Sequence, residues 1–244
     1  MSIPYVPQGT SKRFKVPRTL AADFDRFLAH DIPNTVMDFE LLHNWYDQFK
    51  DDYEPKYIRG ELYPDSTKSR YENTDNNMNI RCSVTSGIRK GDMIIEPDNT
   101  VYILDWDVHL ESNNAPSRAL RCNMMLNIER FEEADVDDLG YVRPGSESGF
   151  VKIVERLPCN AYRYDGRPEY VAVSGTPGAT ANALTLMTVQ FNHRTRDIRI
   201  DDEFTWGNET YQIVDVNRVG IDIFSQHGTL KLQAKKKAGG LHGY

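Results

Sequence analysis

Two stretches of this chain follow one pattern: GDMIIEPDNTVYILD at residues 91–105 and DEFTWGNETYQIVD at residues 202–215. In each, an aspartate precedes a short apolar run, turn-forming residues follow, and a second apolar run ends at an aspartate. Such a sequence predicts a β-hairpin, because the turn residues reverse the chain and the flanking residues favour strands. The hairpin scheme occurs twice, which predicts two β modules in tandem.

Further strands around both hairpins are predicted by an apolar residue at every second position. The first half has Ile80, Cys82 and Val84 on one face, and then one long strand carrying Leu120, Cys122, Met124, Leu126 and Ile128. The second half alternates at Met187, Val189 and Phe191 and at Ile198 and Ile200, and closes with runs at 219–223 and 230–234. Many short strands at close spacing are typical of small β-barrels or sandwiches.

The N-terminal part has a different period. Apolar residues recur at helical spacing over residues 17–30, and again after Pro33 at Val36, Phe39, Leu42, Tyr46 and Phe49, which predicts two amphipathic helices, the second ending near Lys50. Residues 51–77 lack sustained periodicity, which predicts an extended or irregular linker. The sequence therefore predicts a mainly β protein with a helical N-terminal arm (1–75), a first β module (76–145) and a second β module with a mobile, basic C-terminal tail (146–244).

Composition limits the function classes. The 244 residues are 39% hydrophobic and 27% charged, which suits a folded globular protein. No apolar run approaches the roughly 18 residues of a membrane span, and the start lacks a secretory signal, so we expect a soluble, unexported product with no membrane partner. The net charge of -7 argues against tight wrapping of DNA, which needs clustered lysine and arginine.

No catalytic residue, metal site or cofactor is predicted. Asp105 and Asp107 lie two apart on a strand and would share a cation, but no further ligands are identifiable, so a metal-dependent enzyme ranks last. The six histidines are scattered without zinc-site spacing. Cys122 falls in register with apolar neighbours, where a free cysteine behaves as a small hydrophobe.

Charged and aromatic residues provide the remaining candidates. The segment 132–148 predicts a projecting acidic loop carrying Glu132, Glu133, Asp135, Asp137 and Asp138. Basic residues for contact with phosphate or an acidic partner include Arg194, Arg196, Lys235, Lys236 and Lys237. Four aromatic residues, Tyr102, Trp106, Trp206 and Tyr211, would stack bases in an oligonucleotide-binding barrel or fill the barrel itself.

A family resemblance follows from several of these segments. Gly91-Asp92 entering a hairpin, Asp105-Trp106-Asp107-Val108, the Arg121-Cys122-Asn123 strand and the hairpin of residues 204–215 together resemble tailed-phage head-closure proteins, also called stoppers or head-to-tail connectors. The resemblance covers residues 76–236 and does not extend to the N-terminal arm.

The resemblance implies a structural virion protein and no enzymatic step. Its copies would form a sixfold or twelvefold ring below the portal or adaptor, retain the packaged double-stranded DNA and provide the docking surface for tail proteins. Assembly would take place in the host cytoplasm. The acidic loop would face the DNA channel, and the basic residues would contact the adaptor or tail. Tail-completion or tail-adaptor proteins remain an alternative, as does an oligonucleotide-binding barrel.

Overall fold

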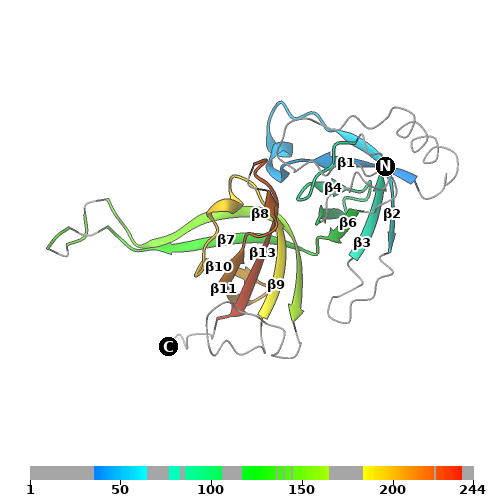
Figure 1. Cartoon of the computed structure of the whole chain (residues 1–244). Coiled ribbons are helices and arrows are strands. Elements are labelled where there is room, and N and C mark those ends of the chain that lie inside the picture. The colour runs from blue at the N-terminus through cyan, green and yellow to red at the C-terminus, as the bar shows by residue number, and fades with distance from the viewer. Residues whose placement is uncertain are drawn as a thin grey trace. The chain divides into compact units, whose positions relative to one another are not determined.

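The chain divides into two compact units, each built from strands (Figure 1). The computed structural model describes residues 36–64, 77–82, 86–105, 117–135, 137–139, 141–143, 145–164, 184–222 and 224–237. The first unit holds the described residues up to Arg121 together with Ile221–Gly228. The second holds those from Cys122 to Gly220 and from Thr229 onward.

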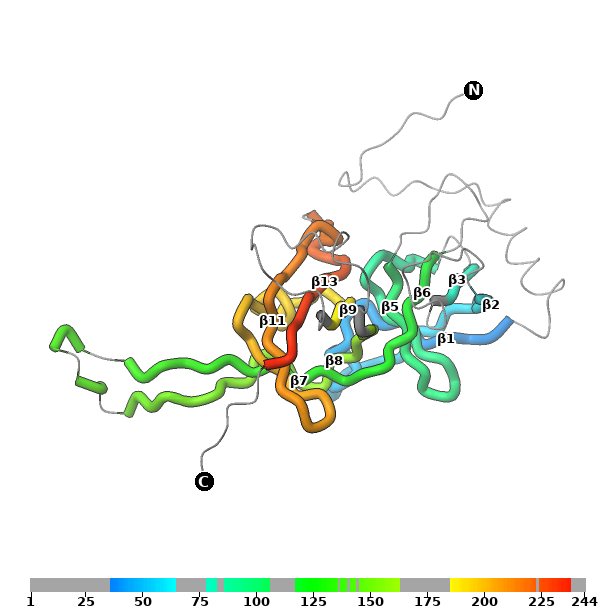
Figure 2. Tube along the Cα trace, turned by 90° about the horizontal axis from the view of Figure 1, so that it is seen from below, coloured from blue at the N-terminus to red at the C-terminus, as the bar shows by residue number. Residues whose placement is uncertain are grey.

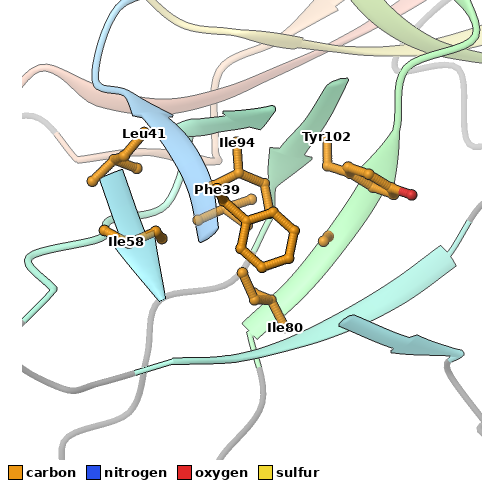
Figure 3. Packing of buried hydrophobic residues seen from close by; sticks show 8 residues of the cluster. Phe39, Leu41, Ile58, Ile80, Ile94 and Tyr102 are labelled. Carbon is orange, nitrogen blue, oxygen red and sulfur yellow. The ribbon is translucent and has the colours of Figure 1, made fainter. Parts of the chain in front are cut away.

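The first unit is a closed six-stranded antiparallel barrel with the strand order β1-β2-β3-β6-β5-β4. Its strands are β1 (Val36–Leu42), β2 (Tyr57–Pro64), β3 (Asn77–Cys82), β4 (Met93–Ile95), β5 (Val101–Leu104) and β6 (Ser117–Arg121). Buried side chains from all six strands meet in its interior (Figure 3): Phe39, Leu41, Ile58, Ile80, Ile94, Tyr102, Leu104 and Ala119. Closure leaves no unpaired sheet edge, since each strand is bonded on both sides.

The second unit contains a second closed barrel. Its strands are β7 (Met124–Glu132), β8 (Gly149–Tyr164), β9 (Leu184–Gln190), β10 (Glu203–Trp206), β11 (Glu209–Asn217) and β13 (His227–Lys236). The sheet order β11-β10-β7-β8-β9-β13 closes through pairing of β11 with β13, and the short β12 (Ile221–Asp222) pairs with β13. The interior is apolar, with Leu126, Ile128, Leu157, Met187 and Val189 all buried.

The two barrels have one topology. Replacing β1 to β6 of the first order by β7, β8, β9, β10, β11 and β13 reproduces the second order. Registers agree as well: Tyr102 pairs with Ile94 as Tyr211 pairs with Phe204, and Ala119 pairs with Leu104 as Ala234 pairs with Ile213. The prediction of two tandem β modules with a repeated hairpin is therefore confirmed, and each module is a barrel.

The predicted helix after Pro33 is wrong within the described residues. Residues Val36–Leu42 form strand β1, and only a short 3-10 helix, η1 (Trp45–Phe49), follows it. The apolar residues of this stretch satisfy both periods, and the alternating set Met37, Phe39 and Leu41 is the one that faces the barrel core. Pairing with β2 and β4 decides the outcome, because tertiary contacts override local propensity. The helix predicted over residues 17–30 lies outside the described residues.

The extended or irregular linker predicted over residues 51–77 is wrong where Tyr57–Pro64 form β2, and residues 65–76 lie outside the described residues. Gly60 disguises this strand, because a glycine stands at a buried position where an apolar side chain would have continued the alternation. A Cβ at Gly60 would lie 2.8 Å from the carbonyl oxygen of Arg81, so the neighbouring strand leaves no room for one. The apolar pattern is thus broken by a packing requirement.

Other corrections concern strand limits. The single long strand expected over residues 120–128 is two strands, β6 and β7, and the chain passes from the first unit to the second between Arg121 and Cys122, whereas the sequence places the boundary at 145/146. Ile198 and Ile200 do not form a strand, since they follow a 3-10 helix, η5 (Thr195–Asp197). Lys235 and Lys236 belong to β13 and are not part of a mobile tail.

Candidate functional site

The most distinctive feature is a β-ribbon that extends from the second barrel (Figures 1 and 2). β7 pairs with β10 only at Ile128 and Glu129, so beyond that point its only partner is β8. We call residues 131–151 the arm. Asp138 is nine positions after Glu129, a separation that corresponds to about 30 Å at roughly 3.3 Å per residue.

The tip of the arm is held by one carboxylate. Oδ1 of Asp137 accepts hydrogen bonds from the backbone N–H groups of Leu139 (2.9 Å) and Tyr141 (2.8 Å). The Asp137 backbone N–H in turn donates to the carbonyl of Tyr141 at 2.8 Å. Asp137, predicted to face a DNA channel, therefore has a structural role in the turn.

Side chains continue the ladder below the tip. The Ser148 hydroxyl accepts from the N–H of Ala134 at 2.9 Å, and the N–H of Arg143 donates to the carbonyl of Asp135 at 2.8 Å. The Arg143 guanidinium also lies 3.5 Å from the Asp135 carboxylate. These bonds give the arm one defined shape, although no other strand pairs with it.

The arm brings all five predicted acidic residues together: Glu132, Glu133, Asp135, Asp137 and Asp138. With Glu147, it holds six carboxylates and one basic side chain, Arg143. Nearly half of the exposed large hydrophobic residues of the described chain also lie on it: Phe131, Leu139, Tyr141, Val142, Phe150 and Val151. A ribbon that is both acidic and apolar on its surface is suited to contact with another macromolecule.

An ion pair anchors the base of the arm. Arg130 donates from Nε to Asp202 Oδ1 at 2.7 Å and from Nη2 to Oδ2 at 3.0 Å, and Nη2 also reaches the carbonyl of Asp197 at 2.7 Å. Oδ2 of Asp202 accepts a further bond, 2.8 Å long, from the backbone N–H of Arg199. Hydrogen bonding to Asp202 raises the pKa of Arg130 above its usual range. The arm thus leaves the barrel from a fixed corner.

The first barrel has the same corner. The Arg89 N–H donates to Asp92 Oδ2 at 2.7 Å, and Nδ1 of His43 lies 3.0 Å from Asp92 Oδ1. Leu42 pairs with Met93 in the first barrel as Glu129 pairs with Glu203 in the second, so Leu42 and Glu129 are equivalent. The residues that follow them, His43 and Arg130, are therefore equivalent as well.

Sequence reasoning missed these corners. The available signal was an Arg-x-x-Asp repeat at residues 89–92 and 199–202, immediately before the two matched hairpins. Both aspartates are fully buried, which is costly for a carboxylate unless it is paired and hydrogen-bonded. The repeat therefore marks the two buried corners.

The predicted basic residues fall into two groups at opposite ends of the second barrel. Arg194 and Arg196 are exposed beside η5, just after the end of β9 at Gln190. Lys235 pairs with Leu184 at the other end of β9, about 20 Å away at roughly 3.3 Å per residue. Lys236 forms an ion pair with Glu209, and Lys237 forms one with Glu203 at 2.6 Å.

Several of the candidate reactive groups are buried. Cys159 and Cys82 are buried, and burial raises the pKa of the Cys82 thiol to about 11 and that of Cys122 well above its usual value. Asp105 is buried, while Asp107 lies outside the described residues. Where the chain is described, no three His, Cys, Asp or Glu side chains gather into a group that would hold a metal ion.

Two of the aromatic residues proposed for base stacking, Tyr102 and Tyr211, already pack against or bond to other residues of the chain. Tyr102 is buried, its hydroxyl donates to Glu96 at 3.1 Å, and burial with the Glu96 charge raises its pKa to about 12. Tyr211 stacks on Phe204 with ring centroids 5.3 Å apart. Trp206 is exposed, and Trp106 lies outside the described residues. One exposed ring is a weak platform for a single strand.

In comparisons with known proteins, no family model, no curated protein and no solved structure matches this chain. Among the described residues, no helix is both long and apolar enough to cross a bilayer.

Proposed function

We propose that this chain is a structural virion protein of a tailed phage, whose copies form a ring in the neck, close the DNA-filled head and attach the tail. The observation that carries the proposal is the arm, a shaped and acidic β-ribbon on a closed barrel. Because closed barrels have no sheet edges with which to associate, subunits of such a protein must join through projecting elements and side-chain surfaces. The resemblance of residues 76–236 to head-closure proteins supports the same role.

The acidic residues fit a path for DNA. Glu132 and Glu133 lie at the stem of the arm, and both are exposed. Carboxylates repel phosphate over about one Debye length, roughly 10 Å at 0.1 M salt, so an acidic wall lets a duplex slide without adhering. We assign the channel-facing role to these stem carboxylates, since Asp135 and Asp137 are bonded within the arm.

The basic residues fit two neighbours. Arg194 and Arg196 lie at one end of the second barrel and Lys235–Lys237 at the other. A protein that joins a portal or adaptor on the head side to tail proteins on the other side needs two such faces. In this proposal no cofactor takes part, and the protein resides at the head–tail interface of the virion after assembly in the host cytoplasm.

The test is deletion of the gene in the phage that encodes this chain, followed by negative-stain electron microscopy of the lysate. Emptied or leaking heads beside free, complete tails are expected. Normal joined virions would overturn the proposal, and full heads beside aberrant tails would favour the tail-completion alternative. Complementation with Glu132→Gln/Glu133→Gln should give joined virions that release DNA poorly.

The oligonucleotide-binding alternative has one observation in its favour, exposed Trp206 beside Lys236 and Lys237. Both lysines are already engaged by glutamates. Tight, salt-dependent binding of a fluorescent single strand that is lost in Trp206→Ala would favour this alternative over the ring.

A further inference from the structure

The arm exposes an apolar surface that its own barrel does not cover. Leu139 is 81% exposed and Tyr141 70% exposed at the tip, and Phe131 and Phe150 form an edge-to-face pair at the stem with centroids 5.4 Å apart. A two-stranded ribbon alone is marginally stable in water. Such a ribbon gains stability by burying these side chains against a partner.

The charge of the rest of the second unit complements the arm. Outside the arm, its described residues carry twelve basic and eight acidic side chains, against one basic and six acidic on the arm. Three exposed arginines lie around η5: Arg194, Arg196 and Arg199. Arg196 lies 3.6 Å from the Asp197 carboxylate, and Arg218 donates to the carbonyl of Ile198 at 2.8 Å. Ile200, 55% exposed, adds an apolar contact to the same loop. We call residues 193–200 the basic loop.

A single copy cannot bring these two surfaces together. The basic loop touches the base of its own arm, where Arg130 bonds to the Asp197 carbonyl. Asp138 is eight positions after Arg130, a separation that corresponds to about 25 Å at roughly 3.3 Å per residue. A tip that meets a basic loop therefore meets the loop of another copy.

We propose that the tip of each arm docks on the basic loop of a neighbouring copy, with Leu139 and Tyr141 against Ile200 and the arm carboxylates facing Arg194 and Arg196. The two patches differ, so the contact is heterologous, and repeating it gives a closed ring or an open filament. This inference rests on the proposed function and specifies how its ring is held together.

Cysteine cross-linking of the full chain tests the contact. Leu139→Cys in one chain and Ile200→Cys in a second, tagged chain are mixed at low ionic strength with a mild oxidant and resolved on a non-reducing gel. Tyr57→Cys, on the first barrel and 64% exposed, replaces Ile200→Cys as the matched control. The native cysteines stay unreactive, because their thiols have raised pKa values.

We expect the Leu139→Cys and Ile200→Cys pair to give at least about tenfold more mixed dimer than the control pair, a difference equivalent to about 1.4 kcal/mol. Both substitutions in one chain should give a ladder ending at one closed species. Arg194→Glu/Arg196→Glu should lower the yield about fivefold for each ion pair lost, whereas Lys56→Glu/Arg59→Glu, with the same change in net charge, should not. A yield equal to the control, or tip-to-tip dimers alone, would overturn the inference.

Failure of this inference and failure of the proposed function look different. If the cross-link does not form but gene deletion leaves leaking heads and free tails, the ring exists and is held by other surfaces. If the ladder forms but deletion leaves joined virions, the chain assembles as inferred and its place in the neck is wrong.

Discussion

Arg130→Met should strongly destabilise the second barrel. The wild-type side chain forms two hydrogen bonds to Asp202, at 2.7 and 3.0 Å, and the Asp202 side chain is only 1% exposed. Methionine fills a similar volume without charge. Asp202 then keeps only the Arg199 N–H bond and is left as an uncompensated buried anion.

The size of the effect follows from this burial. Removing one partner of a buried ion pair costs about 3–5 kcal/mol. The Arg130 side chain is 19% exposed, so water reaches part of the site and the lower end applies. Protonating an ordinary aspartate at pH 7 costs about 4 kcal/mol. The loss of folding stability cannot exceed this value, because the Asp202 carboxyl can take up a proton and avoid being a buried anion. We expect about 3 kcal/mol at pH 7. The penalty should shrink by up to about 1.4 kcal/mol per pH unit on acidification, since the folded variant then favours the protonated carboxyl.

Urea unfolding followed by Trp206 fluorescence measures this change, in a background where Trp45→Phe and Trp106→Phe leave Trp206 as the reporter of the second unit. The reporter is needed because two units need not unfold in one transition. Adding Asp202→Asn to Arg130→Met should recover part of the loss, since the amide oxygen still accepts from Arg199. A penalty below about 1 kcal/mol, or one that does not change between pH 5 and 7, would refute the reasoning.

Three further outcomes are expected. Gly91→Ala should cost more than about 3 kcal/mol, because φ is +88° and the new Cβ would lie 2.1 Å from the Gly228 carbonyl oxygen; urea unfolding followed by Trp45 fluorescence, with Trp106→Phe and Trp206→Phe in the background, measures it in the first unit. Asp201→Gly at the equivalent position should cost less than about 1 kcal/mol in the Trp206 assay of the second unit. The first unit should lose stability as pH falls from about 6.5, because burial and the Arg89 charge lower the pKa of His227 and the unfolded chain therefore binds the proton more readily; thermal melts of His227→Gln should lack this slope. Asp137→Ala should speed hydrogen exchange at Tyr141 while Asp137→Asn leaves it nearly unchanged, because only the amide keeps an oxygen acceptor for the turn; equal rates in both would remove the capping role.

The sequence predicted the hairpins well because their information is local. Gly207, with φ +62°, forms the expected turn between β10 and β11, and Phe204 and Ile213 face the core as their alternation indicates. The first two strands, β1 and β2, were missed because they are determined by residues far away in the sequence. β1 becomes a strand through pairing with β2 and β4, and Gly60 of β2 is glycine because Arg81 lies against it.

The candidate site shows the same division. The five acidic residues were predicted as one projecting segment, and the structure gathers them on the arm. Their individual roles did not follow from composition, since the sequence does not distinguish Asp137, which accepts from the Leu139 and Tyr141 N–H groups, from its neighbour Asp138. The buried partners Arg130 and Asp202 are 72 residues apart, a separation that no local pattern records.

The duplication itself indicates where function lies. Two barrels with the same strand order and matching registers share what the fold needs, including a buried aspartate bonded to the N–H of an arginine three residues earlier. Features that differ between the two barrels are not required by the fold. Between β1 and β2 the first barrel has a connection that contains η1, whereas between β7 and β8 the second has the arm. The residue that bonds to the buried aspartate is His43 in one barrel and Arg130 in the other, and the permanently charged arginine stands at the base of the projecting element. A force applied at the tip of a long arm produces a large torque at its base. The bidentate Arg130–Asp202 ion pair resists such a torque, which suits the contact between subunits that we propose.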